Sequence, residues 1–148
     1  MQWTPDRNAG FSRADPEQLY SQPVLNPMAN FHAVNVETQE RMPTSLLHWM
    51  KRLIDLRRRH PCFGRGSMEL LEPTNARILA YLREYEGQVI LVANNLSRFS
   101  QPAELSLARF KGWTPVEMFG HARFPPVGDG PYFLTFGPHQ FLWLRLER

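Results

Sequence analysis

Apolar and polar residues follow two different periods in the two parts of this chain. Between Leu46 and Arg59, apolar side chains recur at intervals of three and four residues, which predicts one long amphipathic helix. Its apolar stripe includes Trp49, Leu53 and Ile54. Thr44 or Ser45 can cap this helix, and Pro61 ends it because the residue before a proline avoids the α region. We expect the stripe to pack against a partner layer.

A shorter helical turn is predicted just before this helix, over Val34–Arg41. Asn35 can cap the turn, and Pro43 ends it.

From Gly64 onward, the pattern changes to the period of two that is typical of strands. Turn residues separate seven predicted strands, which are Met68–Leu71, Arg77–Arg83, Val89–Asn94, Ala103–Leu107, Val116–Phe119, Tyr132–Phe136 and Gln140–Leu146. Glu86-Gly87 predicts a hairpin, and the continuous apolar run from Val89 to Ala93 predicts a central strand covered on both faces. Strands without intervening helices predict a mainly β fold, an antiparallel β-sandwich or barrel with hairpin and Greek-key connections.

The first part of the chain, about forty residues, has almost no regular period and is rich in Pro, Asn, Asp, Ser and Gly. A long stretch of this kind is uncommon inside a compact domain, so we expect it to pack on a larger body. The predicted division is therefore 1–62 and 63–148.

Composition narrows the class of protein. A hydrophobic fraction of 43% is typical of a globular chain, and no apolar run approaches the length that crosses a bilayer. No signal peptide is evident, and the single Cys62 favours a reducing compartment, so a cytoplasmic location and no membrane contact are expected. The net charge of +3 is a small excess, and Arg57–Arg59 suits a helix C-terminus, so no nucleic-acid binding is expected.

Metal and cofactor chemistry is not indicated by the residues. The five histidines are scattered along the chain, and Gly64-Arg65-Gly66 lacks the spacing of a phosphate loop. No serine stands in a strand, turn and helix context that suits a nucleophile. Catalysis by paired carboxylates is also disfavoured, because most acidic residues fall beside basic ones on predicted surfaces.

Residues Met1–Ser12 place aromatic, acidic, basic and amide groups on a turn-prone segment. Rings pack on sugar faces while such polar groups bond to hydroxyls, so the segment suits a sugar-binding surface, and an ordinary surface loop is the alternative.

The same segment resembles a known family. Its residues MQW, followed by NAGFS at Asn8–Ser12, are similar to the strand-eight region of the oligo-1,6-glucosidase and trehalose synthase branch of the α-amylase superfamily. The intervening Pro5–Arg7 makes it most similar to the trehalose synthase family. Further similar motifs follow in order, at Val34–Gln39, Ser45–Leu47, Leu53–Arg57, Phe63–Gly66, Leu79–Tyr85 and Asn95–Phe99.

The resemblance implies the end of a (β/α)8 barrel followed by a C-terminal β-domain of the amylase type. It implies a parent enzyme that interconverts maltose and trehalose by a retaining mechanism, whose catalytic carboxylates precede residue 1. Asp6, Arg7 and Asn8 match the loop after strand eight and are the expected substrate contacts. The expected partner is the remainder of the barrel, and this chain alone is expected to be inactive.

Two alternatives remain. A related α-glucosidase or isomaltulose synthase shares the MQW and NAGF pattern, and the β-domain could instead be a stand-alone carbohydrate-binding unit. That unit would use a platform of coplanar rings drawn from Trp113, Phe124, Tyr132 or Trp143. A homo-oligomer is compatible with the sequence.

Overall fold

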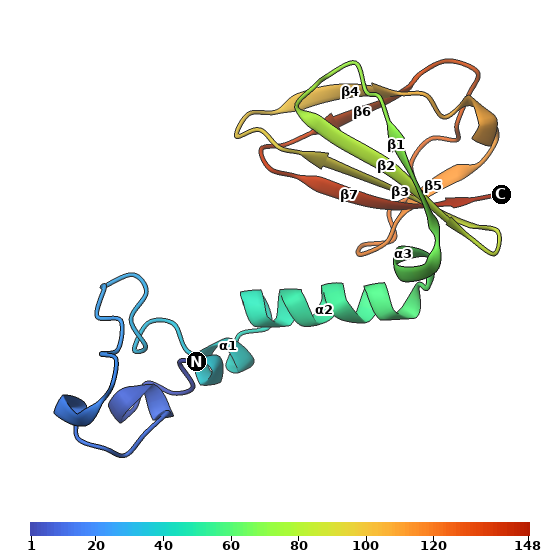
Figure 1. Cartoon of the computed structure of the whole chain (residues 1–148). Coiled ribbons are helices and arrows are strands. Elements are labelled where there is room, and N and C mark those ends of the chain that lie inside the picture. Colours follow the sequence, from blue (N-terminus) through green and yellow to red (C-terminus); the bar gives the residue numbers. More distant parts are fainter. The chain divides into compact units, whose positions relative to one another are not determined.

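The computed structural model describes all 148 residues, which divide into two compact units, Met1–Leu56 and Arg57–Arg148. The first unit contains two single-turn helices, η1 (Arg7–Gly10) and η2 (Pro16–Gln18), and the helix α1 (Val36–Arg41). The helix α2 (Leu46–Arg59) begins in this unit and continues into the second (Figure 1). None of the helices is both long and apolar enough to span a membrane.

Both predicted helices and their caps are confirmed. The Asn35 side chain accepts a hydrogen bond from the backbone N–H of Thr38 at 2.8 Å, which satisfies a donor at the start of α1. Ser45, and not Thr44, caps α2, because its Oγ accepts from the N–H of His48 at 3.3 Å. Ser45 Oγ also donates to the carbonyl of Gln39 at 2.7 Å, so the cap joins the two helices.

The apolar stripe of α2 is only partly buried. Trp49 and Leu53 are half-buried, whereas Ile54 is 52% exposed and Leu56 is the one fully buried residue of the helix. The expectation that this stripe meets a partner layer stays a prediction.

The second unit opens with a single-turn helix that the sequence did not predict, α3 (Cys62–Arg65). Pro61, with φ −54°, precedes it, and a proline suits the start of a helix because its missing N–H would have no intrahelical partner. One turn is too short to display a 3.6-residue period, which is why periodicity missed it.

Seven strands follow in two antiparallel sheets. The strands are β1 (Ser67–Leu71), β2 (Ile78–Tyr85), β3 (Gln88–Asn95), β4 (Gln101–Leu105), β5 (Thr114–Glu117), β6 (Tyr132–Phe136) and β7 (Phe141–Glu147). A five-stranded sheet has the order β1-β2-β3-β7-β5, and β4 pairs with β6 in a second sheet (Figure 1). The fold is mainly β, with antiparallel sheets, as predicted.

The hairpin and the central strand are confirmed. Glu86 and Gly87 join β2 to β3 with φ values of 48° and 80°, as a type I′ hairpin turn requires. β3 lies between β2 and β7, and Val89–Ala93 is buried along its length.

Strand β4 begins earlier than predicted and includes Pro102. A proline cannot donate to a ladder, and it is tolerated here because β4 pairs on one side only, with β6. Leu107 is fully buried but lies beyond the end of β4, so the alternation of buried residues wrongly extended the predicted strand to Leu107.

The core lies between the two sheets. Phe136 and Leu105 of the small sheet and Leu82, Leu91 and Leu144 of the large sheet are all at most 1% exposed. They belong to one continuous apolar cluster, which stabilises the sandwich by removing this surface from water.

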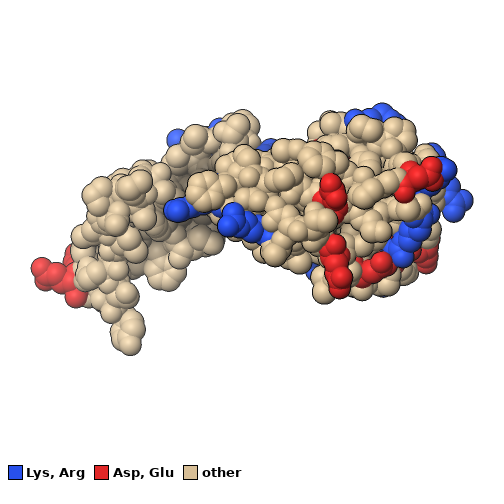
Figure 2. All heavy atoms as spheres, turned by 90° about the horizontal axis from the view of Figure 1, so that it is seen from above, with Lys and Arg blue, Asp and Glu red and all other residues tan.

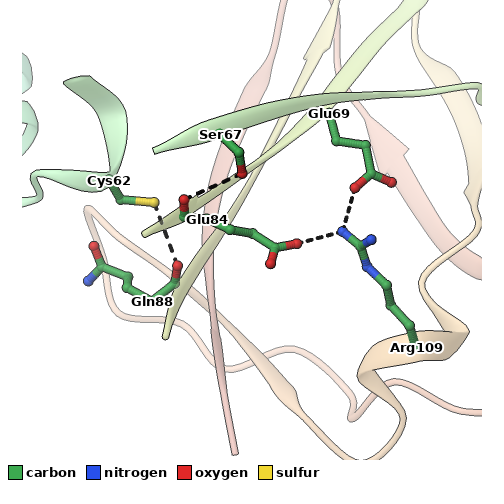
Figure 3. Close-up of polar contacts among 6 residues, drawn as sticks. All are labelled: Cys62, Ser67, Glu69, Glu84, Gln88 and Arg109. Atoms are coloured by element: carbon green, nitrogen blue, oxygen red, sulfur yellow. Dashed lines mark hydrogen bonds and ion pairs between the residues drawn. The ribbon is translucent and has the colours of Figure 1, made fainter. Parts of the chain in front are cut away.

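An ion-pair cluster lies at the edge of the large sheet. The guanidinium of Arg109, from the single turn η3 (Ala108–Phe110), lies between Glu69 of β1 and Glu84 of β2, at 2.6 Å from each carboxylate (Figure 3). Arg109 thus connects the segment after β4 to the first two strands.

Candidate functional site

The segment around Asp6, Arg7 and Asn8 folds into a tight loop. Three consecutive residues, Asn8, Ala9 and Gly10, have φ values of 55°, 57° and 68°. Left-handed backbone is uncommon for non-glycine residues, so other contacts must hold it. The carbonyl of Ala9 accepts hydrogen bonds from the N–H groups of Trp3 at 2.9 Å and Thr4 at 3.2 Å, which closes the loop on itself.

Asn8 is buried and holds the far side of the loop. Its Nδ2 donates to the carbonyl of Ser12 at 3.1 Å and to that of Ala14 at 2.7 Å. Asparagine also tolerates left-handed backbone better than most residues. The side-chain amide N–H groups of Asn8 are therefore committed to loop carbonyls.

Close packing and a positive φ both favour glycine at position 10. A Cβ at this position would lie 2.5 Å from Oγ1 of Thr4, nearer than real Cβ contacts allow. Close packing against Thr4 therefore explains why glycine ends the Asn8–Gly10 part of the motif.

Asp6 and Arg7 border an open hollow of about 560 Å³. Its lining residues are Asp6, Arg7, Gly10, Phe11, Ser12 and Arg13. Arg7 forms an ion pair with Asp15, which orients its guanidinium, while Asp6 is exposed. The structure thus places Asp6 and Arg7 at one hollow, whereas Asn8 does not line it and bonds to the carbonyls of Ser12 and Ala14.

The loop is joined to the segment that leads into α1. The carbonyls of Gln2 and Trp3 accept hydrogen bonds from the N–H groups of Val36 at 2.9 Å and Glu37 at 3.0 Å. Gln2 also donates through Nε2 to the carbonyl of Val34 at 3.2 Å. Two motifs that lie far apart in the sequence are therefore neighbours, which sequence periodicity does not reveal.

The four aromatic residues of the alternative platform do not form one. Tyr132 is 8% exposed and belongs to the core, and Trp113 and Phe124 pack against that core. Trp143 packs on the ring of Phe63 at a tilt of 43°. Tyr132 is buried and the other three rings are only partly exposed, so these residues do not offer the open ring surface that a sugar platform needs.

Two titratable groups near α3 are shifted by burial. Burial lowers the pKa of His60, as do Arg145 and Arg59, against an opposing hydrogen bond with Gln88. Burial has the opposite effect on the fully buried Cys62 thiol and raises its pKa, because the charged form is here the deprotonated one. The Sγ of Cys62 contacts the carbonyl of Gln88 (Figure 3). No three His, Cys, Asp or Glu side chains converge as a metal site would require.

Two family models match consecutive parts of the chain. The model described as "Maltogenic Amylase, C-terminal domain" matches residues 68–143, and "Alpha amylase, catalytic domain" matches residues 1–66. The chain belongs to the maltogenic amylase C-terminal domain family. Together the two matches also confirm membership of the α-amylase superfamily.

Sequence relatives confirm the resemblance to trehalose synthases. The chain is 48% identical over 99% of its length to "Trehalose synthase/amylase TreS" of Mycobacterium tuberculosis, and 47% identical over 99% to "Trehalose synthase" of Thermus thermophilus. It spans 25% of the first relative and 15% of the second. "Probable oligo-1,6-glucosidase 2" of Bacillus subtilis is 38% identical but over only 66% of this chain.

Solved structures share the fold. Trehalulose synthase MutB from Pseudomonas mesoacidophila aligns over 99% of this chain and 24% of its own, with a TM-score of 0.73 and 24% identity. Bacillus licheniformis trehalose-6-phosphate hydrolase aligns over 99% and 25%, with a TM-score of 0.74 and 24% identity. At this identity the likeness supports the architecture of barrel end and β-domain, and no more.

Proposed function

We propose that this chain supplies the end of the catalytic barrel and the C-terminal β-domain of a trehalose synthase that interconverts maltose and trehalose. The observation that carries the proposal is an overall identity of 48% over an alignment that covers 99% of the chain, and so reaches into both units. The 1–62 and 63–148 division of barrel end and β-domain is part of this proposal.

The loop is proposed to contact substrate without performing the chemistry. Retaining glucosyl transfer requires a nucleophile and an acid/base, two carboxyl groups about 5 to 5.5 Å apart. The hollow at the loop is lined by one carboxylate, that of Asp6. Asp6 and Arg7 are therefore assigned to sugar hydroxyls, and Asn8 to holding the loop in its left-handed conformation.

The β-domain is proposed to have a mechanical role. Its large sheet exposes apolar side chains on one face, where Leu70 of β1 lies opposite Tyr81 of β2, and Leu79 is two residues from Tyr81. Met68 and Leu70 are 56% and 63% exposed. Such a patch suits burial against the remainder of the enzyme.

The unpaired Cys62 favours a cytoplasmic enzyme.

The test joins the 148-residue chain to the upstream portion of the Mycobacterium tuberculosis relative. The chimera should convert maltose to trehalose, whereas the chain alone should not. A folded chimera that forms no trehalose would contradict the proposal.

Variants of the chimera test the loop. Asp6→Asn and Arg7→Ala should each lower kcat/KM by about tenfold, the value of a lost hydrogen bond of roughly 1.4 kcal/mol. Glu17→Gln, an exposed residue outside the hollow, is the matched control and should leave kcat/KM unchanged. Equal effects of all three variants would contradict the assignment.

A further inference from the structure

A groove runs along the small sheet of the β-domain. It consists of two adjoining hollows, of about 260 Å³ and 360 Å³, which share Thr74 and Glu104 as lining residues. The first hollow extends to Ser106 and to Asp129, and the second to Phe133. The groove is therefore formed by the β1–β2 loop, strands β4 and β6, and the loop before β6.

An aromatic ring and a carboxylate stand side by side in this groove. Glu104 of β4 and Phe133 of β6 are directly opposite in the strand register, so their side chains project from the same face. Residues on either side of each alternate with them and are buried in the core. Phe133 is 60% exposed, so a large part of its apolar surface is uncovered in this chain.

The wall opposite the sheet is held in place. Asn75 Nδ2 donates to Oε1 of Gln101 at 2.8 Å and to the carbonyl of Pro102 at 2.9 Å. These bonds tie the β1–β2 loop to β4 and so fix the position of the loop residues that line the groove. The groove is therefore preformed, which lowers the entropic cost of binding a ligand.

Carboxylates dominate the charge of the groove. Glu72, Glu104 and Asp129 all line it, and the one nearby lysine, Lys111, is paired with Asp129 at 2.7 Å. Acidic and basic side chains are both visible on the β-domain when it is seen from above (Figure 2). The three carboxylates that line the groove repel phosphates and other anions.

We propose that this groove is a saccharide-binding site that takes a neutral oligosaccharide. The exposed ring of Phe133 offers a flat apolar surface to one pyranose face. The carboxylate of Glu104 and the hydroxyls of Thr74 and Ser106 accept or donate hydrogen bonds to sugar hydroxyls. The two hollows accommodate consecutive sugar units, and the site binds sugar without cleaving it. The proposal does not depend on the enzymatic activity of the parent.

The test is titration of the isotope-labelled 148-residue chain with maltotriose, followed by NMR. Amide shifts should be concentrated at Thr74, Glu104 and Phe133. Phe133→Ala and Glu104→Gln should each weaken binding by about tenfold, as the loss of a central contact does. Phe133 is exposed, so its truncation should leave the dispersed β-domain spectrum intact.

Matched controls distinguish binding at this site from nonspecific binding to the protein surface. Phe99→Ala removes a ring that is 57% exposed outside the groove, and Glu86→Gln removes a carboxylate from the β2–β3 turn; neither should change affinity. The proposal fails if maltotriose shifts no groove amide, if Phe133→Ala binds like the unaltered chain, or if a lysine-rich peptide binds the groove while maltotriose does not.

Discussion

Two neighbouring glycines provide a sharp test of the packing between α3 and the large sheet. A Cβ at Gly66 would lie 2.6 Å from the carbonyl oxygen of Cys62 and 2.8 Å from that of Glu84. Both atoms belong to backbone, which cannot rotate away. A Cβ at Gly64, two residues earlier in α3, would meet nothing within 4 Å. The same substitution, glycine to alanine, thus meets opposite surroundings at the two positions.

The expected changes in the free energy of unfolding differ in sign. Gly66→Ala must displace β1 from β2 or unwind α3, and overpacking of this kind costs about 1 to 3 kcal/mol. Its φ of −70° is ordinary, so backbone strain adds nothing. Gly64→Ala should stabilise by about 0.4 to 1 kcal/mol, because alanine loses less conformational entropy than glycine on folding.

Urea unfolding, followed by the fluorescence of Trp113 and Trp143 in the β-domain, measures both variants against the unaltered chain. Amide exchange at Ser67 and Glu84 then locates the damage, since these residues pair across β1 and β2. The reasoning is refuted if Gly66→Ala is as stable as Gly64→Ala, or if its loosened amides lie elsewhere.

Two further predictions concern charge. Burial lowers the pKa of His60, so the folded state favours the neutral ring. The contribution of this ring to the free energy of unfolding is therefore complete above the ordinary pKa of 6.5, and it is lost as pH falls through the lowered pKa. Urea midpoints measured across this range should fall toward acid, and less so in His60→Gln; an unchanged slope would contradict this. Arg109→Ala should cost about 0.5 to 1 kcal/mol, since the cluster with Glu69 and Glu84 is about half exposed. That loss should shrink in high salt, and a salt-independent loss would point to packing.

Much of the fold could be predicted because its signals are local. The period in Leu46–Arg59, the pair Glu86-Gly87 and the apolar run at Val89–Ala93 each reflect backbone geometry or burial within a few residues. The errors have local causes too. The single turn Cys62–Arg65 is too short to show a period. Pro102 is tolerated in β4 because that strand pairs on one side only, and the residues next to Pro102 in the sequence do not reveal this.

The candidate site was predictable in part. Family motifs identified the loop at Asp6, Arg7 and Asn8, but the position of the three residues in the motif gave all of them the same expected role. The fold distinguishes them: Asn8 is buried against two carbonyls, and Asp6 and Arg7 line a hollow.

By itself, the sequence determined the strands, the long helix and the class of protein, because alternation, capping and ordered motifs are properties of neighbouring residues. Tertiary structure alone decided which distant residues meet. The pairing of Glu104 with Phe133 arises when two residues 29 positions apart in sequence come into register, and the close approach of Gly66 to Glu84 arises in the same way. Such contacts depend on sheet order, which no local pattern specifies.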